Sequence, residues 1–385
     1  MSAAIVEPRV WDELIGQERV VATLRRAVEG ERHAMTHAWL FTGPPGSGRS
    51  NAARAFAAAL QCPDGGCGSC QACVTSLSGA HPDVTVVRTE RLSIGVDEVR
   101  ELVRRAAMAP TLGRYQVLIV EDADRVTERG ADALLKAVEE PAARTVWLLC
   151  APTADDVIVT IRSRCRRVEL RTPSEAAVAE LLQRRDGVEP GLAGFAARAA
   201  QGHVGRARAL ARNEAARQTR TDILRLPQRL GSLGQCLEAA AQVVKSTGDE
   251  AARVTAELDA REQAELSEAL GMGTKGARPR SAQAALSALA DEQKLRAKRL
   301  QRDALDRVLT ELTSYYRDVL VVQTGAGSPV INAEFTEPIH DLAAQSTPAQ
   351  TLRRLDAVLA CRTALETNVA PLLAMEALML GLAQP

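Results

Sequence analysis

The feature that most constrains the fold is a glycine-rich loop at residues 43–50, which reads Gly-Pro-Pro-Gly-Ser-Gly-Arg-Ser. It follows a short apolar run at 38–42 and precedes an alanine-rich segment of high helix propensity. Such a turn between a strand and a helix curls backbone N–H groups around a phosphate, and the helix N-terminus adds partial positive charge. The chain is therefore predicted to contain a phosphate-loop α/β domain.

Further short, β-branched runs alternate with helical patterns along the first 172 residues. The predicted strands are 38–43, 84–88, 116–120, 145–151 and 166–170, and predicted helices at 96–108 and 129–140 lie between them. This alternation predicts a parallel sheet covered by helices on both faces.

After Thr172-Pro173 the strand patterns stop and the remaining sequence is helical. Only ten residues are aromatic, so the core must rest on Ala, Leu and Val, which suits closely packed helices. Short helices are expected at 174–212 and longer ones at 213–385, with a glycine- and proline-containing loop near 271–283. The predicted domains are 1–172, 173–212 and 213–385.

Charge gives little information about partners, because 48 basic residues balance 48 acidic ones. Residues 275–302 hold eight basic and two acidic residues, which fits a solvated helix flank or a contact with DNA or a partner. No run of eighteen apolar residues and no signal-peptide pattern occurs, so a cytoplasmic protein without a membrane partner is expected.

The phosphate loop departs from its usual pattern at one position. Gly43, Gly46 and Gly48 keep the spacing, and Ser50 is placed to bind Mg²⁺, but Arg49 stands where the pattern has lysine. The planar guanidinium does not occupy the space of a compact ammonium. Binding of ATP or ADP with Mg²⁺ is therefore left open, and hydrolysis is expected to be poor.

The acidic pair that should complete the site is also altered. The apolar run at 116–120 leads into Glu121-Asp122, the reverse of the usual Asp-Glu order. Asp122 is one methylene shorter than the usual base that activates water, so its reach to an attacking water is in doubt.

Four cysteines, Cys62, Cys67, Cys70 and Cys73, follow the spacing C-x4-C-x2-C-x2-C with three glycines among them. Four thiolates at this spacing predict a closed, structural Zn²⁺ site, with an iron–sulfur cluster or unligated thiols as the other possibilities. The remaining cysteines, at positions 150, 165, 236 and 361, fall in helical or strand patterns and are expected in the core.

Three segments together resemble one protein family. The run Ala133-Leu-Leu-Lys-Ala-Val-Glu-Glu-Pro141, the triplet Ser163-Arg164-Cys165 and the early segment Trp11-Asp-Glu-Leu-Ile-Gly16-Gln17 are similar to the clamp-loader branch of the AAA+ ATPases. The resemblance covers residues 11 to about 210. It implies an AAA+ domain, with a RecA-like parallel sheet and an inserted zinc module at 62–73, followed by a small helical lid and an all-helical collar.

The resemblance also implies a role. Where the family's motors carry a sensor threonine and a sensor arginine, this sequence has Pro152 and Gly205, whereas Ser163 and Arg164 are intact. This combination resembles a rigid, non-motor subunit that extends Arg164 toward ATP on a neighbour. Implied partners are motor subunits of the gamma/tau type, a delta subunit and, through the hetero-oligomer, the sliding clamp and primed DNA.

Two other interpretations remain. The chain could be an active motor ATPase of the gamma/tau type, or a stand-alone zinc-dependent nucleic-acid binder that uses the basic segment at 275–302. Polymerisation itself is expected to belong to another subunit, because the sequence offers no carboxylate constellation for nucleotidyl transfer.

Overall fold

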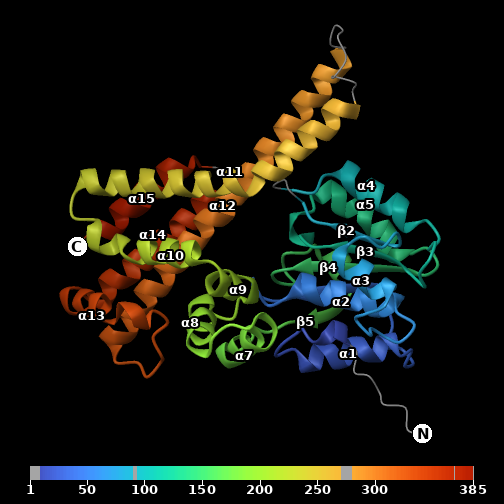
Figure 1. Ribbon diagram of the computed structural model, residues 1–385, viewed down its shortest axis with the longest axis horizontal. Coiled ribbons are helices and arrows are strands. Elements are labelled where there is room, and N and C mark those ends of the chain that lie inside the picture. Colours follow the sequence, from blue (N-terminus) through green and yellow to red (C-terminus); the bar gives the residue numbers. More distant parts are fainter. Residues whose placement is uncertain (1–8, 90–92, 270–279, 368, 385) are drawn as a thin grey trace. The chain divides into compact units, whose positions relative to one another are not determined.

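The protein, described from a computed structural model, divides by its internal contacts into two compact units, Met1–Asn213 and Glu214–Pro385 (Figure 1). The structure describes residues 9–89, 93–269, 280–367 and 369–384. Among them, no helix is both long and apolar enough to cross a membrane.

The first unit is built on a five-stranded parallel sheet in the order β2-β3-β4-β1-β5. The strands are β1 (Ala38–Thr42), β2 (Val84–Val87), β3 (Gln116–Val120), β4 (Thr145–Ala151) and β5 (Arg166–Glu169). Every residue of β1, β3 and β4 is buried, as expected for parallel strands covered on both faces. All five strands predicted from the sequence are confirmed to within a residue or two.

Helices surround this sheet and continue beyond it. The α-helices of the first unit are α1 (Glu18–Val28), α2 (Arg49–Gln61), α3 (Gln71–Ser78), α4 (Val96–Ala106), α5 (Glu128–Glu139), α6 (Val159–Arg162), α7 (Glu175–Asp186), α8 (Pro190–Ala200) and α9 (Val204–Arg212). Short 3-10 turns occupy Arg9–Trp11 and Ala123–Arg125. We call α7–α9 the lid helices.

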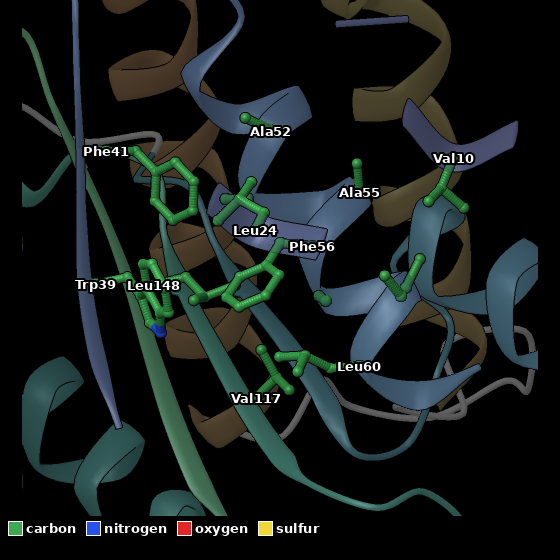
Figure 2. Close-up of a cluster of buried hydrophobic side chains, with 14 of the residues drawn as sticks. Val10, Leu24, Trp39, Phe41, Ala52, Ala55, Phe56, Leu60, Val117 and Leu148 are labelled. Carbon is green, nitrogen blue, oxygen red and sulfur yellow. The ribbon is translucent and has the colours of Figure 1, made fainter. Parts of the chain in front are cut away.

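Side chains that alternate along β1 fill two separate cores. Trp39 and Phe41 point to the side of α1 and α2, where Figure 2 shows them beside Phe56 and Leu24. The rings of Trp39 and Phe56 meet edge-on, with centroids 5.0 Å apart. Leu40 belongs to the other cluster, which includes residues of α4 and α5. Packing from both sides fixes the carboxyl ends of the strands, where the candidate site lies.

The second unit is all-helical, as predicted. Its helices are α10 (Glu214–Leu224), α11 (Leu233–Ala269), α12 (Arg280–Thr324), α13 (Thr336–Gln345), α14 (Pro348–Glu366) and α15 (Pro371–Ala383), with 3-10 turns at Leu226–Arg229 and Ala333–Phe335. Tyr315 and Tyr316 lie at the centre of its apolar core.

Helices α11 and α12 pair into a long two-helix arm that extends past the rest of the second unit (Figure 1). Polar contacts join the two helices there: Arg296 of α12 binds Asp259 and Glu262 of α11, each at 2.9 Å. Part of the basic excess at 275–302 is therefore neutralised across the arm. Lys294, whose side chain is 73% exposed, pairs with Asp291 of the same helix at 3.6 Å.

Two details of the sequence prediction need correction. The loop expected at 271–283 falls mostly on residues 270–279, outside the described part, but residues 280–283 already belong to α12. The alanine-rich sequence from residue 282 onward favours the helical state found there. Cys165 lies in the turn between α6 and β5 and is only half-buried, whereas the cysteines at 150, 236 and 361 are buried as expected.

Candidate functional site

The phosphate loop joins β1 to α2 with the backbone shape that its glycines predict. Gly46 and Gly48 have φ of 83° and 93°, a left-handed conformation that favours glycine. The first turn of α2 has no side-chain cap, which leaves its backbone N–H groups for an anion. Among the described residues, the Ser47 hydroxyl is buried and has no hydrogen-bond partner. The backbone of the loop therefore fits a phosphate.

The guanidinium of Arg49, by contrast, binds the backbone of the loop itself. Nη1 of Arg49 donates a hydrogen bond to the carbonyl of Gly43 at 2.9 Å. Burial raises the pKa of Asp124, and the charge of Asp122 adds to this, while Arg49 acts in the opposite direction. Arg49 thus serves neighbouring groups of its own chain, a role that a lysine reaching for terminal phosphates does not have.

Glu121 of the acidic pair, which directly follows β3, is paired with a side chain of α2. Nε of Arg54, one turn into α2, donates to Oε1 of Glu121 at 2.9 Å, and the Glu121 side chain is 9% exposed. This contact joins the end of β3 to α2, the helix that follows the phosphate loop. It also means that a metal ion would compete with Arg54 for this carboxylate. Arg54 carries no motif signal, and sequence reasoning missed it.

Pro152 and Gly205 stand where the family resemblance implies the two sensors of a motor, and neither has a polar side chain. The carbonyl of Pro152 accepts a hydrogen bond from the backbone N–H of Gly43 at 3.0 Å, so this position supports the loop through its backbone alone. At the lid, Gly205 lies in the first turn of α9, and Nδ1 of His203 caps that helix by accepting from the N–H of Arg206. His203 was not identified from the sequence.

The four cysteines of the predicted metal site converge. Their Sγ atoms all lie within 4.8 Å of one another, and those of Cys67 and Cys70 are each 3.7 Å from that of Cys62. A tetrahedral ion with Zn–S bonds of about 2.3 Å holds its sulfurs about 3.8 Å apart, so the donor set fits such an ion. Four thiolates fill all four positions and leave none for a substrate.

Two helices and one turn place these thiols. Cys62 is the C-cap residue of α2, Cys70 is the N-cap residue of α3, and the backbone N–H of Cys73 donates to the Cys70 sulfur at 3.4 Å. Hydrogen bonds from the backbone N–H groups of Ser69 and Cys70 lower the pKa of the Cys67 thiol to about 6. Burial raises the pKa of Cys73, so metal binding must release protons, as at other thiolate sites.

Arg164 lies in a different part of the same unit, in the turn after α6. Nη2 forms an ion pair with Glu139 at 2.5 Å, and Nη1 donates to the carbonyl of Thr160 at 2.7 Å and the hydroxyl of Ser163 at 3.2 Å. The side chains of Arg164 and Glu139 are 40% and 36% exposed. The cation is therefore held within its own domain by half-exposed contacts.

Comparison with models of known protein families gives two matches that agree with each other. Two family models match, both described as the DNA polymerase III delta subunit: the first covers residues 16–174, and the second, its C-terminal domain, covers residues 286–384. The two matched segments lie on either side of the unit boundary at residue 213.

Curated relatives fall into two groups. The chain is 38% identical over 167 residues to the delta′ subunit of Pseudomonas aeruginosa, covering 42% of this chain and 51% of that protein. It is 30% identical over 220 residues to the delta′ subunit of Bacillus subtilis, covering 56% and 66%. It is 38% identical over 182 residues to the gamma/tau subunit of Mycobacterium tuberculosis, covering 46% and 31%. The chain thus spans about a third to two thirds of the length of these relatives.

Proposed function

Because the chain belongs to the clamp-loader family of DNA polymerase III, we propose that it acts as a delta′-type, non-motor subunit of that loader. In this role it forms a fixed part of a hetero-oligomer with motor subunits of the gamma/tau type and a delta subunit. Arg164 reaches the ATP of a neighbouring motor subunit, and the assembly places the sliding clamp on primed DNA.

The contrast between two sets of charges carries this proposal. Arg49 and Glu121, which a motor needs for its own nucleotide, are engaged by Gly43 and Arg54. Arg164, by contrast, is engaged by Glu139 and by a turn of its own segment, both of them half-exposed contacts. Exposed ion pairs contribute about 0–1 kcal/mol, so a partner's phosphate can draw the guanidinium away at little cost.

At the neighbour's site, Arg164 offsets negative charge that develops on the transferred phosphoryl group. Arginines supplied in this way accelerate hydrolysis by about 10³–10⁵-fold. The segment just before the arginine supports a contact surface there, because Ile158 and Val159 are 38% and 64% exposed. Two exposed apolar side chains beside a cation suit an interface that excludes water from the reacting phosphate.

The cysteine cluster is proposed to hold a structural Zn²⁺. The ion joins the end of α2 to the start of α3 and so supports the helix whose other end begins at the phosphate loop. For the chain's own nucleotide, we propose weak binding of ATP or ADP at most and no useful turnover.

The helical second unit is the proposed collar. Four leucines on its last two helices, at positions 352, 359, 372 and 373, are 42–60% exposed. Such exposed apolar side chains support packing against the collars of neighbouring subunits.

An active gamma/tau-type motor is the second candidate, and one finding favours it: the 38% identity with the Mycobacterium tuberculosis subunit over 182 residues. The two candidates differ in where ATP is hydrolysed. A motor hydrolyses ATP at its own phosphate loop, whereas a delta′-type subunit promotes hydrolysis on its neighbour.

The test is the Arg164→Ala variant in a reconstituted loader with DNA and clamp. DNA-stimulated ATPase should fall severalfold or more, because one neighbouring site loses its arginine. Arg167→Ala, which removes an exposed arginine on β5, is the matched control and should leave the rate unchanged. An unchanged rate for Arg164→Ala in a loader with all subunits present would refute the role.

A further inference from the structure

His203, the N-cap residue of the lid helix α9, packs against Gly46 of the phosphate loop. A Cβ atom added to Gly46 would lie 2.3 Å from Cγ of His203 and 2.6 Å from its Cβ and Cδ2. The imidazole therefore packs directly over the backbone of Gly46, and no side chain fits between them. Gly48, two residues further along the same loop, has nothing within 4 Å of such an added atom.

Other contacts hold the segment that links β5 to the lid helices. A Cβ on Gly202 would lie 2.3 Å from Cγ2 of Thr172 and 2.7 Å from the carbonyl oxygen of Pro173. The side-chain amide of Gln17 exchanges two hydrogen bonds with the backbone of Arg171, at 2.6 and 3.1 Å. Residues 171–173, which lead into the lid helices, are therefore held by Gln17 and by Gly202, the neighbour of His203.

We propose that His203 is a latch that holds the lid helices against the phosphate loop, so that the lid keeps its position without a bound nucleotide. The proposal follows from the contact itself and holds for the isolated chain, whether or not the chain acts in a clamp loader. In a phosphate-loop protein that binds nucleotide, the ligand can bridge loop and lid; in this chain a side chain of the lid makes that bridge.

The electrostatics of the ring agree with this packing. Burial lowers the pKa of His203, and the charge of Arg206 lowers it further. A neutral imidazole meets the backbone of Gly46 without the cost of burying a charge.

The test separates the latch from the capping role of the same residue. Serine is a good N-cap, so His203→Ser removes the ring and keeps a cap for α9. In the full-length chain, backbone amides of residues 175–212 should exchange hydrogen at least about threefold faster in this variant. Amides of the second unit are the internal control and should not change. Unchanged exchange at 175–212 would overturn the latch.

A second measurement tests the contact with a matched pair of variants. Gly46→Ala and Gly48→Ala introduce similar backbone strain, because both positions have positive φ, but only Gly46 faces the imidazole. All three tryptophans lie in the first unit, so their fluorescence during urea unfolding reports on that unit.

Gly46→Ala should shift the unfolding equilibrium at least about threefold further than Gly48→Ala in the wild-type background. In the His203→Ser background this excess should disappear, because the added methyl then has room. If the two alanine variants are equal in the wild type, or if the excess persists without the ring, the proposed contact is wrong.

Discussion

The charged side chains near the phosphate loop and those at the Arg164 turn differ in how far they are exposed and in what they pair with. At the loop, Arg54 pairs with a Glu121 side chain that is only 9% exposed, and Arg49 donates to the loop backbone. At the turn, Arg164 is 40% exposed and its partner Glu139 is 36% exposed. The charged groups near the phosphate loop are therefore paired inside the unit, whereas the Arg164 cation stays accessible to solvent or to a partner.

This difference shows that a phosphate loop with altered side chains can still keep the backbone shape of the motif. The loop keeps its glycines and an uncapped helix start, so its backbone still has the shape that holds a phosphate. The difference from the usual motif lies in the partners of the charged side chains near the loop. The substitution of lysine by Arg49 does not by itself show which partners these side chains have. The ion pair with Arg54 and the packing of His203 become visible only in the folded chain.

The largest effect is expected from removing the proposed metal site at the end of α2, the helix that begins at the phosphate loop. Cys70→Ser should abolish zinc binding and lower the free energy of unfolding of the first unit by about 3 kcal/mol or more, because metal ligation contributes directly to folding. Zinc content by elemental analysis and urea unfolding followed by tryptophan fluorescence measure this.

The matched control is Cys165→Ser, which changes a half-buried thiol outside the cluster and should leave the zinc content unchanged. A Cys70→Ser protein without zinc but with wild-type stability would contradict the structural role of the ion.

A smaller effect is expected from the ion pairs that join two of the lid helices, α7 and α9. Asp186 is 1% exposed and binds Arg208 and Arg212, each at 2.8 Å. Asp186→Asn should destabilise the first unit by about 1–3 kcal/mol at pH 7, because two charge-assisted contacts weaken.

This contribution depends on pH with a definite sign. The hydrogen bond from Arg208, and then the charges of Arg208 and Arg212, hold the pKa of Asp186 below its ordinary value. The stabilisation is therefore complete above the unfolded pKa of about 4 and is lost as the pH falls through the folded pKa. Urea unfolding should show the gap between wild type and Asp186→Asn narrowing below about pH 4. A gap that is constant with pH would contradict the assignment.

The smallest effect is expected at the Arg164 turn. Glu139→Gln should change the unfolding free energy by about 0.5 kcal/mol or less, since the pair is half-exposed. The ATPase of the reconstituted loader should stay at or above the wild-type rate, because Arg164 is then released from its internal partner. A loss of loader ATPase without a loss of assembly would show that Glu139 is needed to position Arg164.

Much of the fold could be predicted from local sequence. The strands at 116–120 and 145–151 are short apolar runs, and fully buried parallel strands have no other way to be encoded. The convergence of the cysteines was equally predictable, because spacings of two residues force neighbouring thiols together.

The rest depended on contacts between distant residues. Arg54 and Glu121 are 67 positions apart, and Arg164 meets Glu139 across 25 residues that include a whole strand. His203 reaches Gly46 only because the lid folds back over the loop. None of these contacts leaves a local periodicity or spacing, so sequence patterns alone do not reveal them.

The most direct test of the account is the ATP turnover of the isolated chain, measured as released phosphate with Mg²⁺, with and without primed DNA. We expect no turnover above background for the wild type, and none for Arg49→Lys, because Pro152, Gly205 and the Arg54–Glu121 pair remain. Sustained, Mg²⁺-dependent hydrolysis by the wild-type chain alone would contradict the account and favour a motor subunit.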